Sequence, residues 1–309
     1  IENNLIYDST DEGIMLQGAP GSLVRSNVVV SLSREMLGGI ALIDPFKYYE
    51  LDGKKRIYDY RDIVIEGNLI LAAGGRIHVG FPMGGSPWNA FFDGTTLLGA
   101  SVLNNHIGGG SAGYGYVISG VDGFEIKGNT SDAIYSGVGD GQGGVIPDTP
   151  RAFMYDPDKI GNSALQPGFI PKQKSLTRVL RANRNPKDSR NAQGYRDQPY
   201  PDPEVRGVVK MAFVEMLGRA PDAAESSHWK TWLQETRSNA DTLRRNLMSQ
   251  PEFIRLHGHV DPLDLHDWRS ERWLKMFLET CSDVQANGAD WPDARSWHTA
   301  LIQSLGHED

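Results

Sequence analysis

The sequence is poor in the features that crosslink a chain or anchor it in a membrane. Its 309 residues contain a single cysteine, Cys281, so an intrachain disulfide framework is excluded. No apolar run reaches the length of about 18 residues that a membrane-spanning helix needs, and no secretory signal peptide is recognisable. Because the first residues already read as the middle of a repeat, we expect the sequence to be a mature form or a fragment of a longer chain.

Strong catalytic motifs are missing as well. The sequence contains no HExxH, GxSxG or Walker loop, and one cysteine without paired histidines excludes a typical zinc site. The net charge of −8 is distributed as −8 over residues 1–150, +5 over 151–203 and −5 over 204–309. Neither acidic half has the basic character of a nucleic-acid-binding protein, so no nucleic acid partner is predicted.

The first half is rich instead in glycine and in a repeated asparagine. Four segments share the pattern apolar-x-x-Asn-x-apolar, and a fifth, at 126–129, matches its first four positions; their asparagines are Asn4, Asn27, Asn68, Asn105 and Asn129. The spacings of 23, 41, 37 and 24 residues indicate a unit of roughly two dozen residues. The two longer units exceed it by about 15 residues, which predicts inserted surface loops near residues 44–61 and 81–96.

Stacked coils explain this pattern physically. Coils about 4.8 Å apart make continuous parallel sheets around an apolar interior. An asparagine at each corner can hydrogen-bond the asparagine of the neighbouring coil and tolerates the left-handed backbone of a sharp turn. Residues 1–150 are therefore predicted to form a right-handed parallel β-helix, an all-β solenoid. The glycosylation sequon at Asn129 is expected to be poorly accessible within such a ladder.

The repeats resemble the right-handed β-helix superfamily typified by pectate lyases, pectin-modifying hydrolases and alginate C5-epimerases. More narrowly, they resemble secreted microbial β-helix proteins. This pectin lyase-like resemblance implies a secreted, extracellular or cell-surface location and a polysaccharide or cell-surface glycan as partner. It leaves the reaction open, because the superfamily also includes phage tailspikes and adhesins without catalytic activity.

The second half is organised differently. Residues 151–203 are rich in proline, asparagine and basic side chains, which predicts a connector packed on the β-helix; a patch for an anionic polysaccharide or acidic partner is the alternative. Residues 204–309 show helical periodicity and are predicted to form a small all-α C-terminal domain. Most of the tryptophans lie there and are expected in its core rather than on a ligand platform.

A motif in that domain carries a second resemblance. The sequence Leu-Gly-Arg-Ala-Pro-Asp at 217–222 is followed by Trp229, Trp232 and Ser-Gln-Pro-Glu-Phe at 249–253. This combination resembles a helical LGRxPD-type domain of unknown function found at the ends of secreted bacterial proteins, distantly similar to phycobilisome linker domains. The resemblance implies surface attachment or self-association rather than catalysis.

Candidate functional residues come from a second series of short strands, at 13–16, 39–42, 76–79 and 114–117. With Ile14, Ile40, Ile77 and Val117 pointing inward, the third residues of these strands share one outer face. These third residues are Met15, Ala41, His78 and Tyr116. The inserted loops carry Tyr48 and Trp88 beside this face, where aromatic rings can stack on sugars; the alternative is that they only pack the loops against the coil.

Acid–base chemistry on a glycan needs suitably spaced carboxyl groups, about 5–10 Å apart in glycosidases. Glu12 and Asp44 are the candidates, because their coils are adjacent. Asp44-Pro45 resembles the Asp-Pro-His core of alginate epimerases, but Phe46 stands in place of the histidine. Epimerase or lyase chemistry then requires His78 as a substitute; the alternative is that His78 is an ordinary surface histidine.

Together these patterns predict Asp44, His78 and Glu12 as catalytic residues and Tyr116, Trp88 and Tyr48 as substrate-binding residues. No metal site or cofactor is predicted, and the glycine-rich segment 137–144 is interpreted as a turn, with a Ca²⁺ loop as the alternative. The expected function is that of an extracellular carbohydrate-interacting β-helix protein, either a polysaccharide lyase, hydrolase or epimerase or a binder. A non-enzymatic surface, adhesive or filament-forming structural protein is the alternative, and the sequence leaves open whether the chain is an enzyme.

Overall fold

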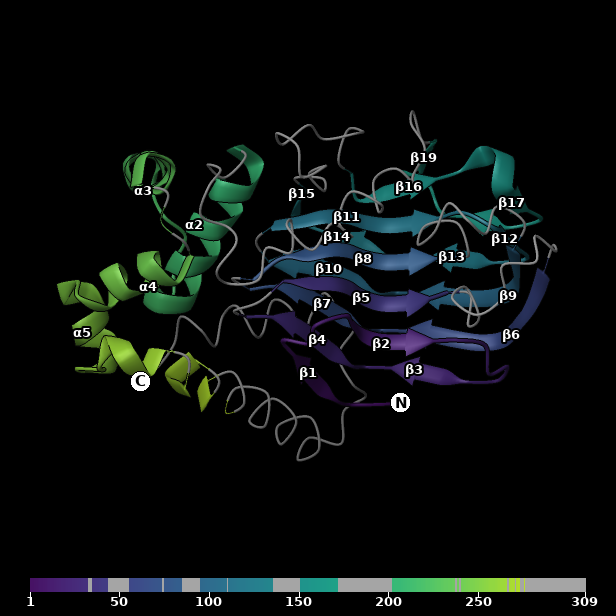
Figure 1. Ribbon diagram of the computed structural model, residues 1–309, viewed down its shortest axis with the longest axis horizontal. Helices are drawn as coiled ribbons and strands as arrows, with labels where there is room; N and C mark the ends of the chain where they lie inside the picture. Colours follow the sequence, from purple (N-terminus) through teal and green to yellow (C-terminus); the bar gives the residue numbers. More distant parts are fainter. Residues whose placement is uncertain are drawn as a thin grey trace.

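The computed structural model consists of parallel β-sheets followed by α-helices (Figure 1). It describes residues 1–32, 35–43, 56–73, 75–84, 95–109, 111–135, 151–171, 202–236, 238, 240–265, 267–269, 271–272 and 275. Three sheets are present, and the chain enters each of them in turn, so that strands close in space come from successive repeats. Every pairing between the named strands is parallel, as stacked repeats require.

The strands of the three sheets follow one another in sequence order. The first sheet contains β1 (Leu5–Tyr7), β4 (Val28–Ser31), β7 (Leu69–Ala72), β10 (His106–Gly109) and β14 (Thr130–Ser131). The second contains β2 (Glu12–Leu16), β5 (Met36–Leu42), β8 (Ile77–Met83), β11 (Ser111–Ile118), β15 (Ile134–Tyr135), β16 (Phe153–Tyr155) and β19 (Ile170–Pro171). The third contains β3 (Leu23–Arg25), β6 (Arg56–Glu66), β9 (Thr95–Leu103), β12 (Val121–Asp122), β13 (Glu125–Lys127), β17 (Ile160–Gly161) and β18 (Ala164–Leu165).

Parallel pairing continues past the expected boundary at residue 150. Strands β16 to β19 extend the second and third sheets to Pro171, where the sequence had predicted a connector. Charge and proline content suggested that connector, but Phe153, Ile160 and Leu165 pack against the core of the sheets. The basic run from Lys172 to Arg196 lies outside the described residues.

The predicted asparagine ladder is confirmed between the third and first sheets. Side-chain amides are hydrogen-bonded in one row: Asn4, Asn27, Asn68, Asn105, Asn129 and finally Gln166. The left-handed residue at each corner is the one before the ladder asparagine, with φ between 54° and 69° at Asn3, Ser26, Gly67, Asn104 and Gly128. Asn129 is buried, as expected for a ladder position.

A column of glycines fixes how closely the first and second sheets approach. Gly13, Gly39, Gly80 and Gly115 occupy equivalent positions in β2, β5, β8 and β11. A Cβ on Gly80 would lie 2.4 Å from the Cδ1 atom of Ile107, and one on Gly39 would lie 2.6 Å from the carbonyl oxygen of Gly80. Side chains of the first sheet and backbone atoms of neighbouring strands fill this space, so only glycine fits the column.

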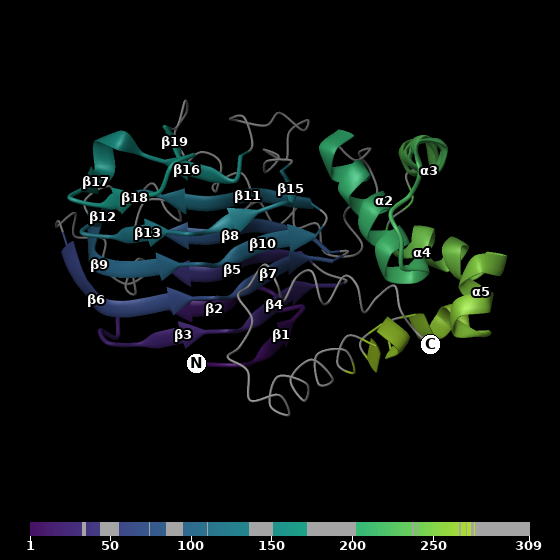
Figure 2. The ribbon, with the colours of Figure 1, turned by 180° about the vertical axis from the view of Figure 1, so that it is seen from behind.

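The helices lie beyond one end of the strands (Figures 1 and 2). They are α2 (Asp202–Leu217), α3 (Ala223–Thr236), α4 (Ala240–Met248) and α5 (Pro251–His257), followed by the short 3₁₀ turn η4 (Pro262–Asp264). Another 3₁₀ turn, η2 (Pro157–Lys159), connects strands β16 and β17. The apolar faces of the helices enclose a second core centred on Phe213, Leu243 and Phe253. Trp229 and Trp232 pack against this core, as the sequence predicted.

The LGRxPD motif builds the corner between α2 and α3. Gly218, with φ of 68°, ends α2 in the left-handed conformation that favours glycine. Asp222 accepts a hydrogen bond from the Glu225 amide while Glu225 accepts one from the Asp222 amide, which is a reciprocal capping box. Arg219 then bridges Glu225 and Glu252, and the motif therefore has a structural role.

Candidate functional site

His78 and Glu35 form the most distinctive polar pair of the second sheet. The Nε2 atom of His78, in β8, is hydrogen-bonded to Oε1 of Glu35, which directly precedes β5. The side chains are only 7% and 13% exposed. The opposite ring nitrogen, Nδ1, is buried and has no hydrogen-bond partner among the described residues. A carboxylate that fixes one imidazole nitrogen sets the tautomer and leaves the other for proton transfer.

Glu35 was not predicted from the sequence, although the repeat spacing indicates its position beside His78. Met36 pairs with Ile77, so Glu35 and Arg76 lie side by side, each directly before the first residue of its strand, β5 or β8. The offset of 41 residues between these partners equals the spacing between Asn27 and Asn68. Applying the ladder spacing to the second strand series therefore brings Glu35 close to His78.

The predicted outward position of Tyr116 is wrong. Its side chain is 0% exposed and stacks between Phe81 and Phe153, with ring centroids 4.7 and 4.9 Å away. Burial raises the pKa of its phenol well above the ordinary value. Tyr116 is thus a core residue of the second sheet and unavailable to a bound sugar.

The predicted register of the second sheet is four residues off in β8, where Phe81 rather than Ile77 pairs with Ile40, and one residue off in β11, where Tyr116 rather than Val117 pairs with Phe81. The sequence aligned Ile77 with Ile14 and Ile40, but the column through Ile14 and Ile40 continues with Phe81 and Tyr116. Gly80 aligns with Gly39 because neither position has room for a side chain, and the stacked rings follow directly after. His78 consequently lies next to Leu37 and Gly113 rather than in the column of Ala41.

The true outward column of the second sheet is apolar. Its members, one per repeat, are Met15, Ala41, Pro82, Val117 and Met154. Only Met15, in the first repeat, is exposed by as much as 37%, whereas Ala41, Val117 and Met154 are buried. This column offers neither carboxylates nor hydroxyls to a glycan.

Of the other predicted site residues, only Glu12 lies in the described part of the chain. Glu12 begins β2, and β5 separates it from β8, so its backbone lies about 10 Å from that of His78 at the usual strand spacing. Asp44, Tyr48 and Trp88 lie outside the described residues. Within the described ranges, no group of three or more histidine, cysteine or acidic residues is arranged to hold a metal ion.

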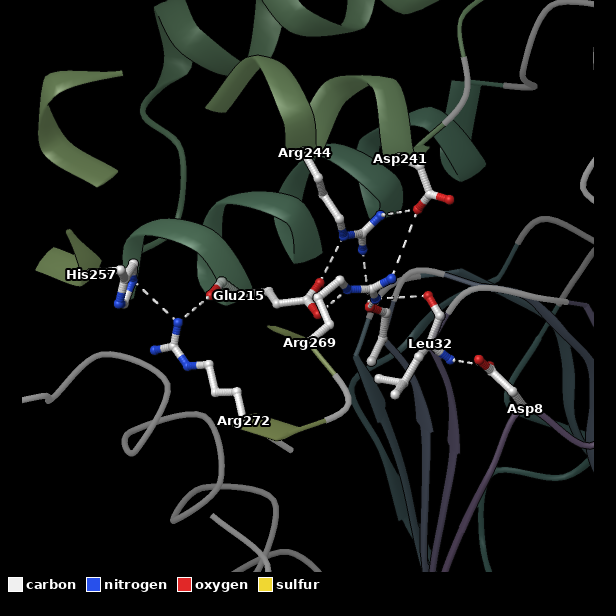
Figure 3. A network of polar contacts seen from close by, with 9 residues as sticks. Asp8, Leu32, Glu215, Asp241, Arg244, His257, Arg269 and Arg272 are labelled. Atoms are coloured by element: carbon white, nitrogen blue, oxygen red, sulfur yellow. Dashed lines mark hydrogen bonds and ion pairs between the residues drawn. The ribbon is translucent and has the colours of Figure 1, made fainter. Parts of the chain in front are cut away.

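A second polar cluster joins the helices to the sheets (Figure 3). Glu215 of α2 accepts hydrogen bonds from Nε of Arg244 at 2.7 Å and from Nε of Arg269 at 2.5 Å. Arg269 also donates to the carbonyl of Leu32 at 2.7 Å, and Arg244 donates to the carbonyl of Ala73 at 3.0 Å. We call Glu215, Arg244 and Arg269 the buried junction, because all three side chains are at most 1% exposed.

The charged side chains of the buried junction lie at the C-terminal ends of strands β4 and β7 of the first sheet. Leu32 and Ala73 directly follow β4 and β7, at equivalent positions. Burial alone would raise the pKa of Glu215, but the charges of Arg269 and Arg244 outweigh it and hold that pKa below its ordinary value. The Asp241 carboxylate lies 3.9 and 3.8 Å from the two guanidinium groups and balances the remaining positive charge.

No sequence pattern links the residues of the junction, which are far apart in the chain, so the junction could not be predicted from the sequence.

Among the residues that the structure describes, no helix is long and apolar enough to cross a membrane. Comparisons with family models, with curated proteins and with solved structures give no match.

Proposed function

We propose that the chain is a non-enzymatic structural protein of the cell surface or extracellular space. In this proposal the three sheets are the faces of a right-handed parallel β-helix, which serves as a rigid scaffold, and the helices are an attachment module. The observation that carries it is the apolar outward column of the second sheet, because the expected catalytic groove would need carboxylates there. The location follows from the resemblance to secreted β-helix proteins alone.

Two further features support a rigid scaffold. The asparagine ladder ties each repeat to the next through buried amides. The buried junction ties the helical part to two successive repeats, through the carbonyls of Leu32 and Ala73. A module fastened in this way has a fixed orientation relative to the sheets, which suits attachment or assembly.

The paired His78 and Glu35 favour a second candidate, a glycan-modifying enzyme. A histidine oriented by a carboxylate is a common arrangement for general acid–base catalysis. In this alternative His78 transfers the proton, and a polysaccharide is the substrate. The buried position of the pair weighs against direct contact with a polymer, so this candidate ranks second.

A glycan panel separates the two candidates. The purified chain is incubated with neutral and acidic polysaccharides, and new reducing ends and unsaturated products are measured. The scaffold proposal predicts no release, with or without binding of the polymer in a sedimentation assay. Release that His78→Ala abolishes, in a variant with unchanged circular dichroism, would overturn the scaffold proposal, provided that the exposed-site control His228→Ala keeps the activity.

A further inference from the structure

The outer face of the first sheet is apolar and buried. Side chains alternate between the two faces of a strand, and Val29 and Ile70 point into the core between the sheets. Their neighbours in β4 and β7 therefore point outward: Val28, Val30, Leu69 and Leu71. None of these four is exposed by more than 2%. Because an uncovered sheet face would be in contact with water, another part of the chain must lie on it.

The elements that the structure describes do not account for this burial. Within the described part of the chain, the elements in extensive contact with β4 are the strands β1, β5 and β7, and those in extensive contact with β7 are β4 and β10. Strands of the same sheet lie beside β4 and β7 rather than over them, and β5 belongs to the second sheet. Helix α2 lies against β11 and β15 of the second sheet instead. A segment outside the described ranges is therefore needed to cover this face.

The chain reaches the edge of this face at Arg269. Its Nη2 atom donates to the carbonyl of Leu32 at 2.7 Å and to that of Ala73 at 3.3 Å, directly after β4 and β7. Glu271 and Lys275, four residues apart, are helical and exposed, so they lie on the side of the helix that faces water. The segment that follows Lys275 thus starts beside the C-terminal ends of β4 and β7.

The sequence of that segment suits an apolar sheet face. Residues 276–309 lie outside the described residues. Trp297, Leu301 and Leu305 recur at every fourth position, which predicts an amphipathic helix over 293–305. A helix of this length extends about 20 Å, whereas the three strand spacings from β1 to β10 amount to about 14 Å. One such helix is therefore long enough to cover the outward residues of β4 and β7.

We propose that the outer face of the first sheet is the docking surface for the C-terminal segment, residues 276–309. The apolar stripe of the segment lies on Val30 and Leu71 and forms a second connection between helices and sheets, in addition to the buried junction. The segment 172–201 is the poorer occupant, because basic side chains recur along it from Lys172 to Arg196 and an apolar face offers them no partner. The inference goes beyond the scaffold function and does not depend on it.

Photo-crosslinking of the full chain tests the proposal. Photo-leucine, which keeps the size of leucine, is incorporated during expression, and ultraviolet light links the side chains that are in contact. Mass spectrometry should find peptides that contain Leu69 and Leu71 joined to peptides from 276–309. Links within the helical core, which contains Leu233 and Leu243, are the positive control.

Three results of this experiment would overturn the proposal. Links from β7 to residues 172–201 would make the basic segment the occupant. Links between a labelled and an unlabelled copy of the chain would make a second molecule the occupant. An absence of links from β7, with the helical core linked normally, would mean that the segment does not lie on this face.

A matched pair of variants gives a second measurement. Leu301→Lys places a charge in the apolar stripe, and Gln303→Lys adds the same trypsin site on the opposite side of the predicted helix. Native-state cleavage within 276–309 should be about tenfold faster or more in Leu301→Lys, since the rate follows the population of the undocked segment. Equal rates in two variants with unchanged circular dichroism would contradict the docking. The glycan panel does not enter these measurements, so failure of the docking proposal is distinguishable from failure of the scaffold function.

Discussion

The asparagine ladder and the buried junction both place polar side chains out of water, but they satisfy them differently. The ladder uses neutral amides, and each amide repeats the bonds of its neighbour along the sheets. The junction uses one carboxylate between two guanidinium groups and occurs once, where helices meet strands. The ladder bonds are distributed over successive repeats, whereas the bonds of the buried junction are concentrated in three residues.

This difference determines where a substitution lowers the stability of the molecule most. Loss of a neutral hydrogen bond in a buried site costs about 1–3 kcal/mol, because one group keeps an unsatisfied polar atom. Loss of one partner from a buried ion cluster costs about 3–5 kcal/mol, since an uncompensated charge remains. The junction is therefore expected to be the weakest point toward mutation, although it contains fewer residues than the ladder.

The largest effect is expected from Glu215→Ala. Removal of this carboxylate leaves the buried Arg244 and Arg269 guanidinium groups facing each other, and we expect a loss of about 3–5 kcal/mol in the free energy of unfolding. Urea unfolding followed by circular dichroism measures it. Glu235→Ala, on the exposed face of α3, is the matched control and should change stability little. Equal stability of the two variants would show that the junction is not needed.

A smaller loss is expected within the ladder. Asn68→Leu leaves the backbone amide of Asn27 without its acceptor and removes one of the two hydrogen bonds to the side-chain oxygen of Asn105, which keeps the bond from the Asn68 backbone amide. The expected cost is about 1–3 kcal/mol. Asn4→Leu keeps the backbone bond to Asn27 and removes only side-chain bonds that are partly buried or exposed, so it should cost a fraction of that. Thermal unfolding of both variants compares the two positions, and an equal or reversed order would contradict the stacking described.

The glycine column allows a test of packing rather than of polarity. Gly80→Ala brings a Cβ against Cδ1 of Ile107, and overpacking of this kind costs about 1–3 kcal/mol. Ile107→Val removes that carbon, so the double variant should recover part of the loss. Gly39→Ala meets the carbonyl oxygen of Gly80 and should not be rescued by shortening Ile70. A double-mutant cycle without coupling between positions 80 and 107 would disprove the contact.

The smallest effect concerns the partly exposed cluster around Arg219. The hydrogen bond from Arg219 lowers the pKa of Glu225 from 4.5 to about 2. A lowered carboxyl pKa contributes stability that is full above pH 4.5 and is lost as the pH falls toward 2. Because Glu225 and Arg219 are 29% and 39% exposed, solvent screening limits the contribution to about 1 kcal/mol or less.

Glu225→Gln should remove this part of the acid dependence. Stability of the parent and the variant is compared by urea unfolding between pH 7 and pH 2.5. The difference between them should shrink as the pH falls from 4.5 toward 2, since the unfolded parent binds a proton at Glu225 while the folded carboxylate stays ionised until the pH nears 2. A difference that stays constant over this range would mean that the ion pair does not contribute.

The features that recur in every repeat could be predicted from the sequence, whereas those that occur only once could not. The asparagine spacing predicted parallel stacking and the ladder, because each repeat imposes the same local requirement on its corner residue. The register of the second sheet was missed at Gly80 and Tyr116, since insertions shift the apolar pattern while the space available at each position is set by the opposite sheet. The buried junction could not be predicted, because Glu215, Arg244 and Arg269 are far apart in the sequence and come together only in the folded chain.

The most direct test of the scaffold account is whether sheets and helices unfold together. Hydrogen exchange of the full chain, measured by mass spectrometry at increasing temperature, follows β4 and β7 beside α2 and α4. The account predicts that all four elements lose protection over the same temperature range, and that Glu215→Ala separates the helices from the strands. Loss of protection in α2 and α4 of the parent well below the temperature at which β4 and β7 open would contradict it.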